Sequence, residues 1–592
     1  MIFKKVFSDL NLEKKDLIFL SILLILTIAI VINKINFHSR VGFNSDVPVY
    51  LSNALYYAGI NYNLLSPNWL NNAPALSFLT SIFFRFGYVT PEALYIVNGI
   101  FEIFGIVGLY IFFKNRFNPL YSLLGCIFFE STYLYLQCAS SGLTDTSAVS
   151  LSVWALVFAI VAFNKNPKYF ILSSIIFTVG MFIRPTVGFV LPIIFLYFVY
   201  KHDLIKLFED LFYDRTKFKD KISAYLRTDE FKYILISVLV CIGLYCIIIL
   251  GNSLIFNVHF DFFDKVDSSM SGFSSRKGLD LGYHPNKDYY TAKLFEFISN
   301  KKISMFGVNL SYILFSIIII GLAIKIIDAV RNFKEYEKLR NKTYYRNPKM
   351  NLILIASILI LLGISVMGSS INHFIPTISL VLIFMIIISM IKQYDIDLNN
   401  HLFFIVNVSW MMIYFVFINY IDIKVYRYFL PILVPIAYLF ALSLESIVFT
   451  IYKFIKNENK HLKDFILKIV PILFIILLLS SIYITLDTYD VKENYHNYFK
   501  IYDDTKHTSK YLMKLDKNYM EKNITTDHRD RFYNWFLKRG TNSIDNLYEP
   551  LHLFDESKSD YLLLNESVDF ENYTEIYHHG RSHLYVNNNN LK

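Results

Sequence analysis

The stretch KKVFSDLNLEKKDLIFLSILLILTIAIVIN, residues 4–33, decides the class of fold that this chain adopts. Lysines stand at both ends of its polar part, and residues 17–33 carry no charged side chain. An apolar run of about 20 residues crosses the hydrocarbon core of a bilayer as a helix. Because Lys and Arg stay on the cytoplasmic side, the stretch predicts a first span with the N-terminus inside. No small-residue cleavage site follows it, so we interpret it as an uncleaved anchor.

The composition of the whole chain is also typical of a membrane protein. Of its 592 residues, 55% are hydrophobic and 18% are charged, whereas soluble domains average roughly 45–50% and about 25%. The formal net charge of +9 is divided between the two sides of a membrane, so it does not indicate a nucleic-acid partner. We therefore expect a lipid bilayer as the environment and no nucleic acid.

Apolar windows predict an α-helical polytopic membrane protein with about thirteen transmembrane helices. The predicted spans are residues 17–33, 94–113, 120–137, 148–163, 169–183, 186–200, 231–250, 303–324, 352–369, 374–391, 402–419, 429–451 and 465–486. Alternation then places the lysine-rich connections in the cytoplasm, as the positive-inside rule expects. We expect a multi-pass transmembrane domain over residues 1–486, with outer loops at 34–91 and 251–302.

The tail, residues 487–592, differs in kind from the rest of the chain. It is rich in Asp, Asn, His and Tyr and alternates short helical and strand patterns, which predicts a small α/β domain on the extracytoplasmic side. Its segment HHGRSH, residues 578–583, has residue types that bind metals. The alternation favours instead a strand with Tyr577, His579 and Arg581 on one face, so we expect no metal site there.

The segment FNSDVPVYLSNALYYAGINY, residues 43–62, follows the first span and is too polar and short to be a second one. Asn44 or Ser45 can cap a helix that begins at Asp46, and this helix is expected to lie in the interface plane. Tyr50 follows Asp46 at a spacing of four residues, on the same face. The carboxylate of Asp46 either favours the N-terminal dipole of the helix or takes part in a functional site.

Other polar side chains are expected at the same outer face of the bundle. Asp145 opens the fourth span, and Arg184 interrupts two apolar runs in GMFIRPTVGF, residues 180–189. Arg427 and Tyr428 stand at the outer start of the twelfth span. Two carboxylates and two guanidinium groups would thus gather at one end of the bundle, which suits proton abstraction beside a phosphate.

These motifs resemble the C-type (GT-C) glycosyltransferase superfamily, close to the protein O-mannosyltransferases and the lipid A aminoarabinose transferases. The resemblance is carried by Asp46, Tyr50 and Ala54 at four-residue steps and by four further motifs. These are NAPALSFLTSIFFRFG at residues 72–87, the Thr-Asp pair at 144–145, Arg184, and RYFLPILVP at 427–435. The chain departs from many relatives in having Val47 after Asp46, where they have a second acidic residue. It also lacks the Trp-Trp-Asp signature of oligosaccharyltransferases, so transfer of a whole oligosaccharide is not expected.

The resemblance implies a hexosyltransferase of the cell membrane. It would move a single sugar, with inversion, from a polyprenyl (dolichyl) phosphate donor to a hydroxyl of a protein, lipid or glycan outside the cytoplasm. Asp46 would be the catalytic base. Substrate-binding residues would be Tyr50, Asp145, Arg184, Arg427 and Tyr428. No cofactor is implied, and dependence on a divalent metal stays open.

Two further implications concern the second outer loop and the alternatives to an enzyme. Loop 251–302 would be a mobile lid, in which His259 and His284 either contact substrate or are solvated. A transporter or flippase of a lipid-linked glycan would use the same basic groups without needing a base. A non-catalytic membrane scaffold is a third interpretation.

Overall fold

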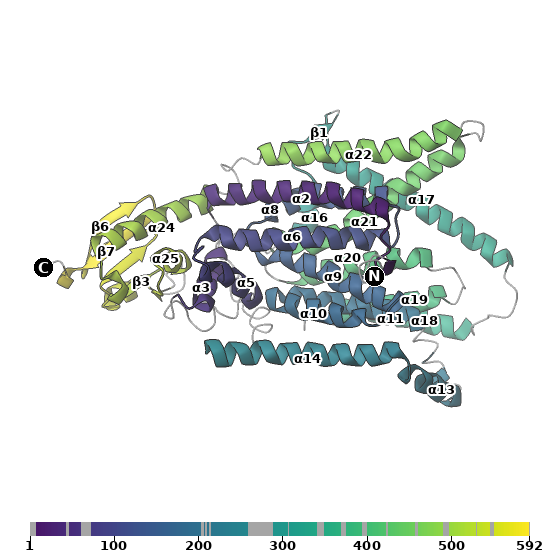
Figure 1. Ribbon diagram of the computed structural model, residues 1–592, viewed down its shortest axis with the longest axis horizontal. Helices are drawn as coiled ribbons and strands as arrows, with labels where there is room; N and C mark the ends of the chain where they lie inside the picture. Colours follow the sequence, from purple (N-terminus) through teal and green to yellow (C-terminus); the bar gives the residue numbers. More distant parts are fainter. Residues whose placement is uncertain are drawn as a thin grey trace.

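A computed structural model gives the arrangement of the chain as a helical bundle with a small sheet domain at one end (Figure 1). This confirms the predicted fold class, a multi-pass α-helical membrane protein with a small α/β domain at its C-terminus. The structure describes residues 8–42, 46–60, 73–202, 207, 210–211, 215–257, 288–305, 307–339, 348–368, 374–392, 399–421, 424–455, 460–488, 496–527, 530–544 and 550–590.

The helices of the bundle coincide with the predicted spans. Within the described residues, nine helical stretches are long and apolar enough to cross a membrane, and four shorter apolar helices account for the other predicted positions. The helices are α2 (Lys14–Val41), α6 (Pro91–Lys114), α7 (Pro119–Ser131), α8 (Tyr133–Cys138), α9 (Thr144–Asn164), α10 (Tyr169–Ile183), α11 (Val190–His202), α14 (Asp229–Phe256), α17 (Leu310–Leu339), α18 (Pro348–Gly368), α19 (Phe374–Lys392), α20 (Asn399–Tyr420), α21 (Leu430–Phe454) and α22 (Lys460–Thr488).

Three predicted spans differ locally from what the hydropathy windows indicated. The span predicted at 120–137 is two helices, because the backbone at Thr132 is extended and ends α7. The span predicted at 303–324 begins only at Leu310, after a short hairpin of β1 (Ser304–Met305) and β2 (Val308–Asn309). The span predicted at 186–200 opens with the 3₁₀ turn η1 (Pro185–Phe189), since a proline disfavours helical geometry in the residue before it.

Shorter helices lie outside the spans, at both ends of the bundle. The helices near the sheet domain are α3 (Val47–Ala58) and α5 (Pro74–Arg85), each with a proline in its first turn, where the missing N–H costs nothing. Helix α16 (Tyr289–Ile298) packs on α8, whereas α13 (Arg215–Leu226) lies at the opposite end of the molecule (Figure 1). Asp46 is the N-cap of α3, so the helix begins one residue later than predicted.

Several sequence predictions fall on parts of the chain outside the described residues. Asn44 and Ser45, the predicted caps of the α3 helix, belong to them. So does most of the expected lid, residues 258–287, with His259 and His284.

The C-terminal domain packs helices on one mixed sheet. The strand order is β4-β3-β5-β7-β6, with β3 parallel to β4 and β5, and β7 antiparallel to β5 and β6. Its elements are α24 (His496–Leu515), η3 (Tyr519–Glu521), β3 (Ile524–Thr526), α25 (Asp530–Leu537), β4 (Asn542–Ser543), α26 (His552–Glu556), β5 (Tyr561–Leu564), β6 (Tyr573–His579), β7 (Ser582–Asn587) and η4 (Asn588–Asn590).

The strand expected around HHGRSH is present as β6, and Tyr577 and His579 share the face toward α24 as predicted, but Arg581 does not belong to that face. The register shifts between Glu575 and Tyr577, and Arg581 lies in the turn to β7 rather than on the strand. A bulge of this kind changes which side chains share a face. Glu575 and His578 therefore lie together, instead of on opposite faces as a regular strand would place them.

The C-terminal domain is docked on the bundle through apolar contacts. Phe532 and Trp535 of α25 belong to the same buried cluster as Val47 and Leu51 of α3, and Trp535 stacks on Phe84 of α5 at 6.1 Å between ring centroids. The result is that one face of the sheet domain covers the end of the bundle at α3 and α5 (Figure 1).

Candidate active site

The turn before α9 holds Asp145 at the end of the bundle. Glu102 of α6 accepts hydrogen bonds from the backbone N–H and the hydroxyl of Ser140 at 2.7 and 3.0 Å. Asn98, one turn earlier, donates to the carbonyl oxygen of Leu143 at 2.6 Å. These contacts fix the residue that precedes α9, so that Thr144 and Asp145 form its first, buried turn.

Arg184 stands where α10 ends and contacts that turn. Its backbone is extended, which the following Pro185 favours. Its Nη1 atom lies 2.8 Å from Oδ1 of Asp145 and donates to the Thr144 hydroxyl at 2.9 Å. The guanidinium also lies over the ring of Tyr428, 5.0 Å from the centroid. A cation over an aromatic face is held electrostatically, so Tyr428 helps to orient Arg184.

Arg427 lies between the two carboxylates. It belongs to the 3₁₀ turn η2 (Tyr426–Phe429), which opens the span of α21. Its Nη2 atom is 2.6 Å from Oδ2 of Asp46, and its Nε atom is 3.8 Å from Oδ2 of Asp145. One guanidinium therefore links the outer helix α3 to the buried start of α9.

A further arginine reaches the site from the C-terminal domain. Arg531 of α25 brings Nη1 to 3.6 Å from Oδ1 of Asp46. Sequence analysis missed Arg531. The pattern that could have suggested it is the charge-dense segment DHRDRF at 527–532, placed before an apolar helix face. The site is thus a row of alternating charges: Arg531, Asp46, Arg427, Asp145 and Arg184.

The surroundings of Asp46 keep it ionised. Burial raises the pKa of its carboxyl, but Arg427 and Arg531 lower it by more, so that the pKa lies below its ordinary value. Tyr50, one turn along α3, has a pKa raised by burial and by the charge of Asp46. Tyr50 is therefore a neutral hydroxyl beside an ionised carboxylate at neutral pH.

A cavity of about 880 Å³ opens beside these groups. The lining residues that sequence analysis predicted as substrate-binding are Tyr50, Asp145, Arg184, Arg427 and Tyr428. The remainder of the wall is mostly apolar and comes mainly from η1, α9, α10, α11, α19 and α20. Some of its apolar side chains are exposed, namely Leu191, Phe195, Ile378 and Leu382. The cavity therefore joins a charged end to an apolar wall.

The structure brings all six predicted site residues together. Five line the cavity, and Asp46 contacts one of them, Arg427.

Comparison with known proteins finds a family resemblance in one part of the chain. Residues 71–212 match the family described as dolichyl-phosphate-mannose-protein mannosyltransferase. This segment contains α5 to α11 and hence Asp145 and Arg184. The match confirms the resemblance to C-type glycosyltransferases that the motifs indicated. A search of curated proteins finds no match for the chain.

Solved structures of similar layout include two membrane proteins. ArnT from Cupriavidus metallidurans bound to undecaprenyl phosphate is 8% identical, with a TM-score of 0.49, and the match covers 95% of this chain and 97% of that one. The oligosaccharyltransferase from Archaeoglobus fulgidus in the apo form is 13% identical, with a TM-score of 0.45, over 90% of this chain and 65% of that one. At these identities and scores, neither structure assigns a function to this chain.

Proposed function

We propose that this protein is a membrane glycosyltransferase that moves a single sugar from a polyprenyl (dolichyl) phosphate donor to a hydroxyl of a protein, lipid or glycan. The observation that carries the proposal is the cavity, which has guanidinium groups at one end and a long apolar wall. A polyprenyl phosphate sugar has the same two parts, an anionic head and a long apolar tail. The family match over residues 71–212 supports the same chemistry.

Arg184 and Arg427 would bind the donor phosphate. Both line the cavity, at the end where the charged side chains gather. A guanidinium can meet phosphate oxygens bidentately. The phosphate gains negative charge as the sugar leaves it, so these cations stabilise the transition state more than the ground state. Asp145 contacts both arginines and would hold them in position.

Asp46 would act as the base on the acceptor hydroxyl. The acceptor oxygen forms a bond to the anomeric carbon while the bond from that carbon to the phosphate oxygen breaks. The hydroxyl proton passes to Asp46, and the polyprenyl phosphate leaves on the opposite face, which inverts the anomeric configuration. In this scheme Arg427 turns from Asp46 toward the donor phosphate when the donor binds, which frees Oδ2 to accept the proton.

The extracytoplasmic location of this reaction rests on charge placement. The basic helix α13 lies at the end of the bundle opposite the C-terminal domain (Figure 1). Basic residues mark the cytoplasmic end of a bundle. The end with Asp46 and the C-terminal domain would then face outward.

The experiment is sugar transfer in membranes supplied with a radiolabelled polyprenyl phosphate sugar. We expect Asp46→Asn to lower turnover by about 10²–10⁴-fold, the usual contribution of a general base. Asp569→Asn, which neutralises an exposed carboxylate of the C-terminal domain, is the matched control and keeps wild-type turnover. Full turnover by folded Asp46→Asn protein would remove Asp46 as the base.

A flippase for a lipid-linked glycan is the second candidate, because a cavity with a charged end and an apolar wall would also admit such a molecule. Purified protein in vesicles separates the two functions. Sugar on an added acceptor supports the transferase, whereas donor that crosses the bilayer unchanged, with no transfer, supports the flippase.

A further inference from the structure

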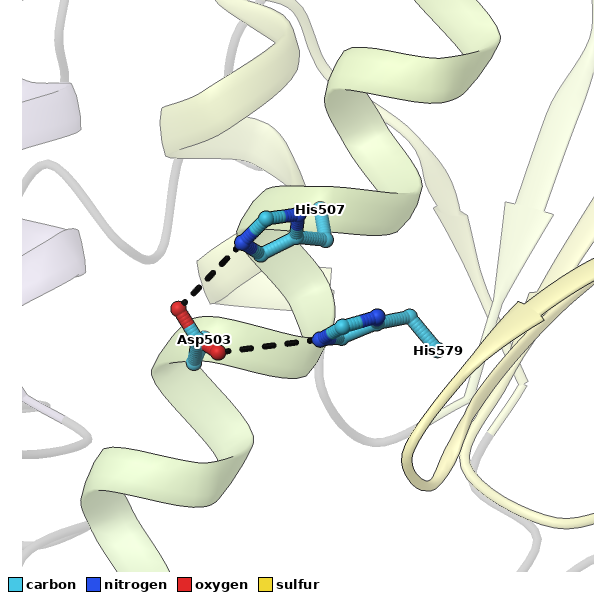
Figure 2. Close-up of side chains that lie close together, drawn as sticks. All are labelled: Asp503, His507 and His579. Carbon is cyan, nitrogen blue, oxygen red and sulfur yellow. Dashed lines mark ion pairs between the residues drawn. The ribbon is translucent and has the colours of Figure 1, made fainter.

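Three side chains of the C-terminal domain converge at the tip of the β6–β7 hairpin, away from the charged row. Asp503 and His507 lie one turn apart on α24, and His579 is the last residue of β6 (Figure 2). The Nε2 atom of His507 lies 3.6 Å from Oδ1 of Asp503, and that of His579 lies 3.6 Å from Oδ2. One ligand atom from each residue falls within 4.8 Å of the others.

These distances suit a shared metal ion better than direct hydrogen bonds. A separation of 3.6 Å is longer than a nitrogen–oxygen hydrogen bond. Donors at zinc bond lengths of about 2.0–2.2 Å in tetrahedral geometry lie about 3.3–3.6 Å apart. Each histidine faces a different oxygen of Asp503, and the two rings stack at 4.3 Å with an interplanar angle of 22°. The three donors therefore lie close enough together to share one ion.

The hairpin tip is held against α24, so His579 is placed before any ion binds. The backbone N–H of Arg581 donates to Oδ2 of Asp504 at 3.0 Å. Gly580 has a φ of +56°, and a Cβ at this position would collide with the carboxylate of Asp504. A side chain other than hydrogen is thus excluded both by backbone conformation and by space. The fixed turn keeps His579 beside His507 without the conformational cost of closing a loose site.

We propose that Asp503, His507 and His579 bind a divalent transition-metal ion, with Zn²⁺ as the best match. Two imidazoles and one carboxylate are a ligand set that zinc accepts, and they leave a fourth position for water. The ion joins α24 to the β6–β7 hairpin. Because α24 also packs Tyr502 against Gly42, where the bundle meets the C-terminal domain, the ion stiffens the part of the domain next to this contact. The proposal does not depend on the proposed transferase activity.

A second group of similar composition lies on the other side of β6 and serves as an internal control. One oxygen of Glu575 lies 3.1 Å from Nδ1 of His578 and 3.3 Å from Nδ1 of His583. This oxygen is within hydrogen-bond distance of His578, so the carboxylate already has a direct partner. We therefore assign the metal to the Asp503 group alone.

The test counts zinc on the full-length protein purified in detergent. The protein is stripped with a chelator, dialysed against Zn²⁺ and then against metal-free buffer, and its bound zinc and melting temperature are measured. We expect wild type to retain about one equivalent more than His507→Gln and His579→Gln. Zinc should raise the melting temperature of wild type but not of these two variants, since binding stabilises only the state that has the site.

His578→Gln is the matched control, because it removes an imidazole from the neighbouring group on the same strand. We expect it to keep the wild-type zinc content and the zinc-dependent melting shift. Equal zinc content in wild type and His507→Gln, or loss of the equivalent only in His578→Gln, would overturn the proposal. A variant that does not fold is replaced by Asp503→Asn, which keeps the shape of the side chain but weakens the ligand.

Discussion

Two guanidinium groups contact the carboxylate of Asp46, and they set what this residue can do. Arg427 lies at 2.6 Å and Arg531 at 3.6 Å. The pKa of Asp46 is raised by burial and lowered to a greater extent by these cations, so the group is ionised at neutral pH. A base must be ionised, but a lowered pKa also weakens its hold on a proton. Both arginines therefore keep the proposed base ionised, and both also lower its affinity for the proton that it must accept.

Substitution of Arg531 tests this tuning. Arg531→Gln removes one of the cations that lower the pKa of Asp46, so that pKa rises toward its ordinary value. The base works when deprotonated, so activity is lost as the pH falls through its pKa. We expect the acidic limb of the kcat/KM profile to move to higher pH than in wild type, because less positive charge then stabilises the ionised carboxylate.

The control for Arg531→Gln is Arg581→Gln, which neutralises an exposed arginine in the same domain. Its profile should coincide with that of wild type. A lower kcat/KM for Arg531→Gln with an unmoved acidic limb would mean that Arg531 acts on docking alone and not on Asp46.

At the scale of elements, the turn between α8 and α9 positions the acidic half of the site. Gly142 in this turn has a φ of +77°. A Cβ on Gly142 would lie 3.1 Å from side-chain atoms of both Tyr95 and Val47. Val47 follows Asp46 directly, so the turn that carries Asp145 also packs against the start of the helix that carries Asp46. Glycine is needed here both for its backbone conformation and for the space it leaves.

Gly142→Ala is expected to disturb both carboxylates. Left-handed backbone costs an alanine about 1–2 kcal/mol. The added methyl also presses on Val47 and Tyr95, so transfer activity should fall at least about tenfold, since small misplacements of reacting groups are costly. The measurements are turnover and melting temperature in detergent.

Gly87→Ala provides a matched comparison for Gly142→Ala. Gly87 has a φ of +87°, but nothing lies within 4 Å of a Cβ placed there. The Gly87→Ala variant should have a lowered melting temperature, because of its left-handed backbone, but wild-type turnover. Equal loss of turnover in both variants would contradict a positioning role for the Gly142 contacts.

At the scale of the whole molecule, the C-terminal domain packs against the end of the bundle that carries the candidate site. Trp535 is buried against Phe84, in the apolar cluster that also contains Val47 and Leu51. A separate cluster, which includes Leu512, Tyr533 and Leu563, forms the core of the domain itself. The contact with the bundle can therefore be weakened without unfolding the sheet.

Trp535→Ala should loosen this contact. Truncating a buried Trp costs about 3–5 kcal/mol of stability. Here most of this loss would fall on the contact between the domain and α5. We expect faster cleavage by protease between α22 and α24, together with the same shift of the acidic limb as in Arg531→Gln, because Arg531 leaves Asp46. Leu551→Ala, at an exposed position, is the control. Unchanged proteolysis and an unchanged pH profile would show that Trp535 does not hold the domain in place.

Much of the architecture followed from the sequence, because a bilayer imposes a simple rule on it. Each span must be long and apolar, so the helices could be located from hydropathy alone. The break at Thr132 and the late start of α17 could not, because a hydropathy window averages over the few polar residues at these positions, such as Glu130 and Asn309. The bulge between Glu575 and Tyr577 was not predicted either, because a bulge is a feature of strand pairing.

The sequence predicted which residues belong to the candidate site but not which of their side chains contact each other. A charged residue in or near an apolar run is costly and therefore conspicuous, which is how Asp46, Asp145, Arg184 and Arg427 were found. Which charge contacts which was decided by tertiary structure, since Arg427 and Asp46 are far apart in the sequence yet 2.6 Å apart in space. Arg531 was not predicted, because a charged side chain in a polar segment has no desolvation cost that would single it out. Only the docking of α25 on α3 brings it to Asp46. The sequence by itself determined where the chain meets lipid, whereas the packing of helices and tail decided how its charges pair.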